Sequence, residues 1–458
     1  DGTITARRVT IYWNVGAYAS SSAHLVPAGV LRSIGPYRIP AVHVDSYGVF
    51  TNLPIAAAYR GAMSSQGVFA HESHMDTIAC SLGIDPLALR KKNLLCSGDN
   101  FATGEQMEDI HFNECLQAAV DGINWNKPLQ CGERATRKRG RGAAVMMKNT
   151  IANSSSECRI ELDVEGLVTL FVSTVEMGQG GHTAMAQIAA DALRLPMGSI
   201  RVRGPDTDKT PPDSQTASSR NTHMMGNAVI NAASSMIHKL VSAAEPIFKC
   251  SFEDISVADG HVFVTTQTQD RKTYSEVLRF NNISKLTAKG EYVTNVGKLD
   301  PETGQGVSTP EWHQGAGACE VEVDTQTGKV IVLRYHSAAF AGRVVNPLLA
   351  GLQNDGNVIF GLGAALLEEV AIDHGEIINP NFSDYMIPSF LDIPLELNNV
   401  SLEREASHFH GLGEMTLPPV APAIANAIYD AVGVRIRDLP LTAERVFRAI
   451  KDQVGYEE

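Results

Sequence analysis

Glycine-rich turns placed directly before predicted helices restrict the fold of this chain most. The turn at residues 177–181 (MGQGG) follows a strand pattern and precedes an amphipathic helix over residues 182–195, which ends at Pro196. A second turn, at residues 411–419, leads into a helix predicted over residues 421–432. Glycine lets the backbone approach a ligand closely, and the N–H groups at a helix start attract anions. The sequence therefore predicts strand, turn and helix units with binding sites at the turns.

The other patterns predict strands and helices that do not alternate strictly, which is typical of the α+β class. A chain of 458 residues is long enough for two domains. A polar connection over residues 95–141 predicts a first domain over residues 1–132 and a second over 133–458. We expect the basic run at residues 134–141 (RATRKRGR) to be a solvated part of this connection. Predicted strands cover 4–13, 41–51, 157–162, 167–174 and a hairpin at 318–335, and predicted helices cover 67–82, 86–94, 112–120, 226–244 and 356–370.

Charge, apolar runs and cysteines argue against several classes of protein. The net charge of −13 disfavours a nucleic-acid surface, because phosphate binding needs clustered Lys and Arg. No apolar stretch approaches the ~20 residues of a membrane helix, and no signal peptide pattern opens the chain. The seven cysteines include no C-x-x-C pair, which disfavours disulfides, zinc and an iron–sulfur cluster held by this chain. We expect a cytoplasmic protein, and a further segment or subunit before residue 1.

Three segments offer groups that could hold an anionic or oxygen-rich ligand. In the MGQGG turn, Gln179 adds an amide donor, although the pattern taken alone favours an ordinary tight turn. The segment 214–221 (SQTASSRN) offers hydroxyls, an amide and a cation, as phosphate binding requires, and its alternative is a solvated loop. Arg60 follows a strand-like stretch and could hold an oxyanion, unless it is a surface arginine.

Glu414 is the candidate general base. It follows two glycines and precedes an apolar, proline-bearing stretch (MTLPPVAPA), and apolar walls raise the pKa of a carboxyl group. The alternative is a surface glutamate before a helix. His408 and His410 flank the same loop and could tune the base. A separate H-E-x-H motif at residues 71–74 lacks the zinc-protease spacing, so we interpret it as part of a helix face.

Several separated segments together resemble the C-terminal portion of the molybdopterin-binding subunit in the xanthine dehydrogenase and aldehyde oxidoreductase family. The similarity covers residues 1 to about 452, with the segments in the same order. They are AYRG (58–61), MDTIACSLGIDPLALRKKNLL (75–95), VEMGQGGHTAMAQIAADALRL (175–195), VEVDTQTGKVIVLRYHSAA (321–339), GRVVNP (342–347), GLGAALLEE (361–369) and GLGEMTLPPVAPAIANAIYDAVGVRIRDLPLTAERV (411–446).

The resemblance implies a two-domain molybdopterin-binding fold and a molybdenum hydroxylase that uses water as oxygen donor. Glu414 would take the proton of a metal-bound hydroxyl, hydride would pass to a sulfido group, and electrons would leave through iron–sulfur and FAD partners. The pterin, with a cytosine dinucleotide form as one option, would hold molybdenum without any side-chain ligand. Ala62 and Met63 would line the substrate pocket. The residues implied to hold the cofactor are Arg60, Gly178, Gln179, Gly180, Thr216, Ser218, Ser219 and Gly413.

Departures from the family pattern bear on the substrate. Purine-hydroxylating relatives carry a Phe where Ala62 stands, and Ala28 lies near their substrate-binding Arg, with Arg32 out of register, so both positions argue against xanthine. Carbon monoxide dehydrogenases carry a Cys where Gly61 stands. An N-heterocycle is slightly favoured as substrate, with an aldehyde as the alternative. A non-catalytic cofactor-binding or assembly subunit would not need Glu414, and a nucleotide-binding dehydrogenase would need a Rossmann fingerprint that the sequence lacks.

Overall fold

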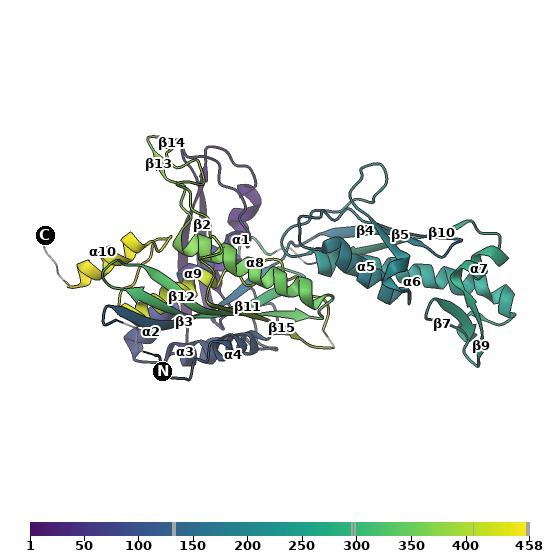
Figure 1. Ribbon diagram of the computed structural model, residues 1–458, viewed down its shortest axis with the longest axis horizontal. Helices are drawn as coiled ribbons and strands as arrows, with labels where there is room; N and C mark the ends of the chain where they lie inside the picture. The colour runs from purple at the N-terminus through teal and green to yellow at the C-terminus, as the bar shows by residue number, and fades with distance from the viewer. Residues whose placement is uncertain (131–133, 295, 297–298, 406, 455–458) are drawn as a thin grey trace.

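The chain forms two lobes that lie end to end in the computed structural model (Figure 1). The structure describes residues 1–130, 134–294, 296, 299–405 and 407–454. The larger lobe holds the segments before about residue 150 and after about residue 310, and the smaller lobe holds most of the chain between them. Strands and helices are mixed without strict alternation, so the predicted α+β class is confirmed.

A mixed sheet forms the centre of the larger lobe. Its strand order is β15-β12-β11-β3, with β3, β11 and β12 antiparallel and β15 parallel to β12. Side chains alternate between the two faces of β3: Ala143 and Val145 belong to the core under α4, and Ala144 belongs to the core under α8 and α9. The elements are β3 (Arg137–Asn149), β11 (Trp312–Asp324), β12 (Val330–Gly342), β15 (Glu396–Glu403), α4 (Phe112–Gly122), α8 (Pro347–Leu366), α9 (Val420–Val432) and α10 (Ala443–Val454).

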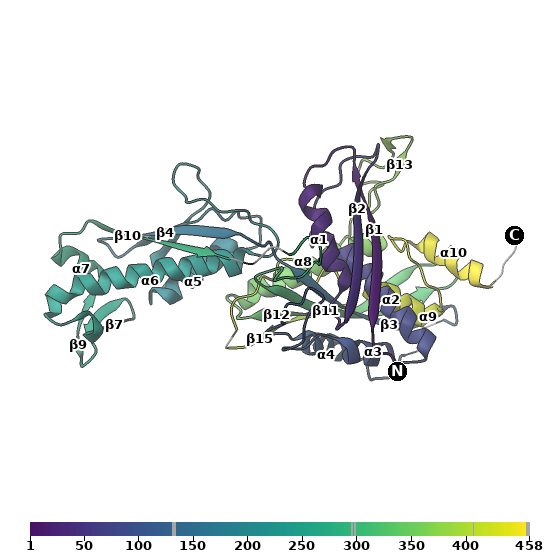
Figure 2. The ribbon, with the colours of Figure 1, turned by 180° about the vertical axis from the view of Figure 1, so that it is seen from behind.

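A parallel strand pair, β1 (Ala6–Gly16) and β2 (Ala41–Phe50), stands against this lobe and is seen best from behind (Figure 2). The connection between them is helix α1 (Ser22–Ile34), which the sequence did not reveal because Pro27 and Gly29 interrupt its pattern. Parallel strands need such a crossover. The following helices, α2 (Ser64–Leu82) and α3 (Pro86–Asn93), agree with the prediction, and Gly83 ends α2 with a φ of 65°.

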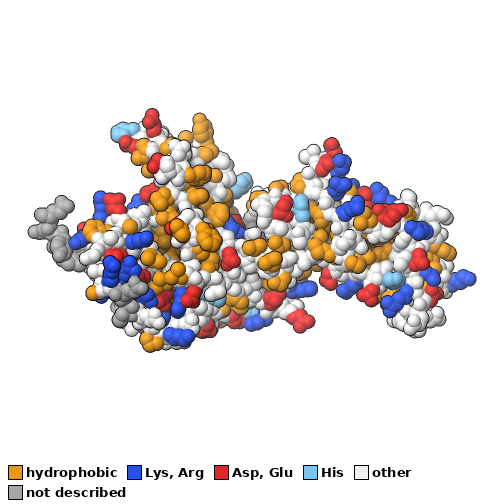
Figure 3. Space-filling view, viewed as in Figure 1, with side chains coloured by type: hydrophobic (Ala, Val, Ile, Leu, Met, Phe, Trp, Pro, Cys, Tyr) orange, Lys and Arg blue, Asp and Glu red, His pale blue; other side chains and the backbone are white. Residues whose placement is uncertain are grey.

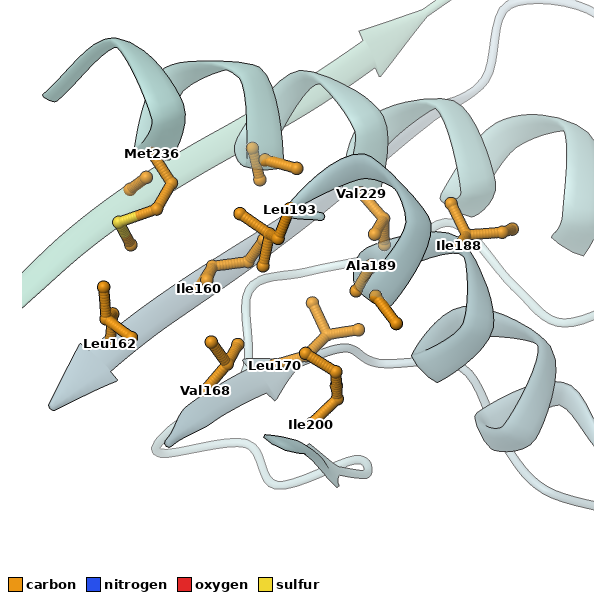
Figure 4. Close-up of a cluster of buried hydrophobic side chains, with 14 of the residues drawn as sticks. Ile160, Leu162, Val168, Leu170, Ile188, Ala189, Leu193, Ile200, Val229 and Met236 are labelled. Atoms are coloured by element: carbon orange, nitrogen blue, oxygen red, sulfur yellow. The ribbon is translucent and has the colours of Figure 1, made fainter. Parts of the chain in front are cut away.

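The smaller lobe packs two helices on a second sheet of order β10-β4-β5-β6 (Figure 4). Ile160, Leu162 and Leu170 point from the strands toward Val229 and Met236 of the long helix. The elements are β4 (Ser155–Asp163), β5 (Val168–Phe171), β6 (Ile200–Arg203), β10 (Lys285–Val293), α5 (Gly181–Ala192), α6 (Asn221–Phe248), α7 (Tyr274–Phe280), the short turns η1 (Met197–Ser199) and η2 (Phe252–Asp254), and the outer strands β7 (Ile255–Ala258), β8 (His261–Val264) and β9 (Gln267–Thr273).

The basic run is not a solvated linker, so that expectation was wrong for residues 137–141. These residues begin β3, and their arginine side chains meet glutamates on the neighbouring strand β11. Arg137 and Arg139 lie 3.1 and 3.0 Å from carboxylate oxygens of Glu322, and Arg141 lies 3.1 Å from Glu320. The pairing neutralises both sets of charges, which the basic run alone could not show.

The predicted domain boundary between residues 132 and 133 lies outside the described residues. Segments on both sides of it share one core, in which Leu116 of α4 packs with Val145 of β3 and Phe340 of β12. The division into domains at this point remains a prediction.

Exposed hydrophobic side chains gather on the larger lobe over α8 and the segment 370–395 (Figure 3). This segment includes β13 (Ile372–Asp373) and β14 (Glu376–Ile377). Phe390 and Leu391 are 88% and 92% exposed. Exposed apolar patches of this kind mark contact surfaces. No helix in the described part of the chain is long and apolar enough to cross a membrane. The described cysteines form no disulfide bonds.

Candidate active site

A cavity of about 540 Å³ lies where the two lobes meet. The smaller lobe supplies the turn before α5 and the loop before α6, and the larger lobe supplies α8 and the loop before α9. All the residues that the family resemblance assigned to the cofactor line this one cavity, together with Glu414. They are Arg60, Gly178, Gln179, Gly180, Thr216, Ser218, Ser219 and Gly413.

The glycine turn before α5 is closed by the chain's own groups. The Glu176 carboxylate accepts N–H groups from Gly178 (3.1 Å), Gly180 (2.9 Å) and His182 (3.1 Å). The helix start that we expected to attract a ligand anion therefore already binds an internal carboxylate. The Gln179 amide donates to the carbonyl of residue 175 at 2.7 Å and fixes the shape of the turn.

Two glycines of this turn have different spatial roles. Gly178 has a φ of 98°, and an added Cβ there would meet nothing within 4 Å, so its backbone borders open space. At Gly180 a Cβ would come within 2.6 Å of Leu349 on α8, so glycine permits the close approach of the two lobes.

The loop before α6 closely approaches residues 411–419, the loop that carries Glu414 and is called the base loop below. Ser218 and Ser219 both have a φ of 57°, a conformation that is costly for residues other than glycine. The carbonyl oxygen of Ser219 lies only 1.5 Å from where a Cβ on Gly411 would stand. Arg220, the cation of the predicted phosphate-binding set, is 1% exposed and is paired with Asp213 at 2.8 Å. Its guanidinium also donates to the carbonyl of Gln215 at 2.7 Å and so stabilises the loop before α6.

Glu414 lies in the cavity wall with its side chain 17% exposed. Its Oε1 accepts the Gly61 N–H at 3.0 Å, and its Oε2 accepts the Ser219 hydroxyl at 3.2 Å and lies 2.8 Å from Nζ of Lys148. Burial alone would raise the pKa of Glu414, but the charge and hydrogen bond of Lys148, followed by the Gly61 N–H and His313, lower it to about 2. The predicted raised pKa is therefore wrong, because a buried cation outweighs the apolar walls.

Arg60 joins the base loop to α8. Its Nε donates to the carbonyl of Gly413 at 2.5 Å, and its guanidinium donates to Oε1 of Gln353 at 2.7 Å. The guanidinium also lies 5.8 Å from the ring centre of Phe360. Arg60 is thus held at the cavity wall, and burial lowers the pKa of its guanidinium, although Glu414 opposes this shift.

Ala62 and Met63 do not line the large cavity. They border a separate hollow of about 100 Å³, with Trp13 and Arg60. Arg32 is 5% exposed. Its guanidinium donates to the Ala62 carbonyl and, at 3.0 Å, to Oδ1 of Asn149, so it is already hydrogen-bonded within the chain. The structure therefore separates the two predicted substrate residues from the predicted cofactor residues, with Arg60 shared by both hollows.

Sequence reasoning missed the buried polar groups behind Glu414. Lys148 is one, and its signal was a single lysine inside the apolar run GAAVMMKNT. Glu311 is another: its carboxylate lies 2.5 Å from Nε2 of His313 and 3.0 Å from Nδ1 of His223. Burial opposes the charge on Glu311, but the two histidines hold its pKa well below the usual range. His410, which flanks the base, lines the cavity and lies 3.6 Å from Glu311.

The cavity is large enough for a cofactor and is lined by segments from both lobes. Its lining includes the glycine turns, the hydroxyl-bearing residues Thr216, Ser218 and Ser219, and Arg60. Its volume is within the range of small-molecule and cofactor sites. Among the described residues, no group of three or more His, Cys, Asp or Glu side chains is placed to hold a metal ion directly.

Comparison with known proteins gives consistent matches. A family model described as "Molybdopterin cofactor-binding domain" matches residues 118–394, and a second with the same description matches residues 1–94. The putative xanthine dehydrogenase molybdenum-binding subunit of Escherichia coli K12 is 31% identical over 98% of this chain and 60% of that protein. The large subunit of nicotine 6-hydroxylase from Paenarthrobacter nicotinovorans is 28% identical over 98% of this chain and 58% of that protein. The chain thus spans about three-fifths of these relatives.

Solved structures show the same fold. Quinoline 2-oxidoreductase from Pseudomonas putida 86 superposes with a TM-score of 0.88 and 25% identity, over 99% of this chain and 61% of that one. The aldehyde oxidoreductase from Desulfovibrio desulfuricans superposes with a TM-score of 0.85 and 27% identity, over 98% of this chain and 47% of that one.

Proposed function

This chain belongs to the molybdopterin cofactor-binding domain family of xanthine dehydrogenase-type proteins, and from this premise we propose that it is the catalytic part of a molybdenum hydroxylase. The observation that carries the proposal is the position of Glu414 in the wall of a cavity lined by the family's glycine turns. A carboxylate that is ionised at neutral pH and faces a cofactor-sized cavity can accept a proton from a group bound there.

Each lining segment has a role in the proposal. Gly178 would let the pterin approach the backbone, Gly180 would keep the turn close to α8, and Gln179 would keep the turn in shape. The hydroxyls of Thr216, Ser218 and Ser219 would bind the phosphate part, and Arg60 with Gly413 would fix the loop that carries Glu414. When bound, the molybdenum cofactor would supply the two-electron acceptor for the reaction.

Glu414 would act as general base through its carboxylate, which lies in the cavity wall. The overall change replaces a C–H bond of the substrate by C–OH, with oxygen from water, and releases two electrons and two protons. Glu414 would receive one of these protons at Oε1 or Oε2, while Gly61 and Ser219 keep the carboxylate oriented. The electrons would pass to iron–sulfur and FAD groups on partner subunits or domains.

We propose an N-heterocycle or an aldehyde as the substrate, with the N-heterocycle first. Ala62 borders the smaller hollow that shares Arg60 with the cavity, and it offers no aromatic ring on which a purine could stack. The exposed apolar surface on α8 and the segment 370–395 supports a protein partner. The cytosine dinucleotide form of the cofactor and a cytoplasmic location are also part of the proposal.

The test is a Glu414→Gln substitution in the native complex, assayed against N-heterocycles and aldehydes, with Glu165→Gln at an exposed turn as the matched control. The proposal expects turnover to fall by roughly 100-fold or more in Glu414→Gln, as for the loss of a positioned base, while the metal content is unchanged. Full activity in Glu414→Gln would favour a non-catalytic cofactor-binding or assembly subunit instead.

A further inference from the structure

A lysine is buried in the core of the larger lobe, next to the proposed base. Residues 140–149 of β3 are all buried, and Lys148 is 1% exposed. Lysine is almost never fully buried unless it is paired, because removing an ammonium group from water is costly. A lysine that follows the buried apolar stretch 142–147 of this strand is therefore expected to have a specific partner.

That partner is Glu414. The Lys148 Nζ lies 2.8 Å from Oε2 of Glu414 and donates to Oγ of Ser218 at 3.2 Å. Gly61 and Ser219 donate to the same carboxylate from two other segments. Donors from three separate parts of the chain thus fix both oxygens of the base, and one of these donors carries a charge.

Other charges surround the pair but do not replace Lys148. Arg32, Arg60 and His313 interact with Glu414 by longer-range electrostatic attraction, without an ion-pair contact. Glu311 interacts with Lys148 in the same way. Glu311 already has two histidine partners. Within the described part of the chain, Lys148 is the one cation that has a nitrogen within 4 Å of the Glu414 carboxylate.

We propose that Lys148 is a positioning residue that keeps the Glu414 carboxylate ionised and oriented toward the cavity. The inference rests on the proposed function of Glu414 as base. A buried ion pair contributes little to stability compared with apolar residues of the same size, so a purely structural role explains Lys148 poorly. Removal of Lys148 leaves a buried carboxylate without its cation, and burial then favours the protonated form, which cannot accept a proton.

The experiment compares the pH dependence of kcat/KM in the wild-type complex, Lys148→Met and Lys148→Arg. The control is Lys289→Met on β10, where the lysine is exposed. In Lys148→Met we expect the acidic limb of the kcat/KM profile to move to higher pH by about one unit or more. At pH values below this limb, kcat/KM should then be about tenfold lower than in the wild type. Lys148→Arg, which keeps the charge, and Lys289→Met are expected to keep the wild-type limb.

A second measurement does not depend on turnover. Infrared titration of the resting complex, with Glu414→Gln as the subtraction, gives the protonation curve of the Glu414 carboxyl group directly. We expect this curve to move to higher pH in Lys148→Met by the same amount as the kinetic limb. Should Lys148→Met fail to fold, Lys148→Gln carries the same expectation in both measurements.

An unchanged protonation curve in the neutral variant, with a rate loss that is equal at all pH values, would overturn the proposal and leave Lys148 with a structural role. Failure of the proposed function looks different. In that case Glu414→Gln retains turnover, while the infrared titration still decides whether Lys148 holds the carboxylate ionised.

Discussion

Replacement of Arg90 by Met should destabilise the larger lobe more than most single changes. Arg90 on α3 is 1% exposed, and its guanidinium binds three acceptors on α2. Its Nε lies 2.8 Å from Oε2 of Glu72, and its two terminal nitrogens lie 2.6 Å from Asp76 and 2.9 Å from the Glu72 carbonyl. Glu72 itself is 0% exposed and also accepts the backbone N–H of Val145 on β3 at 2.9 Å. The guanidinium therefore fixes the joint between α2, α3 and the central sheet.

The expected cost follows from this burial. Removal of one partner of a buried ion pair costs about 3–5 kcal/mol, because the remaining charge is left without compensation. Hydrogen bonds to Val145 and Tyr37 still satisfy part of the Glu72 carboxylate, which keeps the expected loss within that range. The matched control is Arg448→Met on α10, where the ion pair with Glu444 is 73% and 70% exposed, so its loss should cost about 0.5 kcal/mol or less.

Urea unfolding of the two variants beside the wild-type protein measures both losses in free energy of unfolding. Arg90→Met is expected to lower the free energy of unfolding several times more than Arg448→Met. Equal and small losses would show that the buried guanidinium is not needed for the joint, and the reasoning from burial would be refuted.

The remaining predictions concern the base loop and acid stability. Gly411→Ala should displace Ser219 and lower both the molybdenum content and the turnover. Gly413→Ala should have a mild effect, because its Cβ would lie 3.3 Å from the Ser219 hydroxyl. Equal effects of the two variants on metal content and turnover would contradict this prediction. Burial opposes the charge on Glu72, but Arg90 and its other partners lower the pKa of this carboxyl group from its ordinary value of 4.5 to about 2. A lowered folded-state pKa contributes stability above about 4.5, and this is lost as the pH falls toward about 2. In urea unfolding at a series of pH values, the difference in free energy of unfolding between the wild type and Glu72→Gln should therefore shrink as the pH falls from about 4.5 to about 2. A difference that stays constant over this range would contradict the lowered pKa of Glu72.

Local patterns were enough for elements that follow one clear period. Helices α2, α5 and α9 and the hairpin of β11 and β12 lie where the sequence predicts them, because each has its own periodicity and stop signal. Helix α1 was missed, since Pro27 and Gly29 hide its pattern and only the crossover between parallel strands requires it. The basic run was misjudged because its glutamate partners on β11 lie far away in the sequence.

The same distinction holds for the candidate site. The glycine turns and Glu414 could be found from local sequence, and the structure brings them to one cavity. The direction of the pKa shift of Glu414 could not be predicted from local sequence, because Lys148 lies in a distant strand and meets the carboxylate only in the folded chain. Likewise, nothing local indicated that Glu176 would bind the N–H groups at the start of α5.

The central claim is that the cavity between the lobes holds a molybdenum cofactor. Its most direct test is metal and pterin analysis of the purified native complex, beside a Gly180→Ala variant. The φ of 74° at this position disfavours an L side chain, and the added Cβ would meet Leu349 at 2.6 Å, so the turn that lines the cavity would be distorted. The account predicts about one molybdenum per chain in the wild type and a clear loss of both metal and pterin in the variant. An intact, folded complex without molybdenum or pterin would contradict the account.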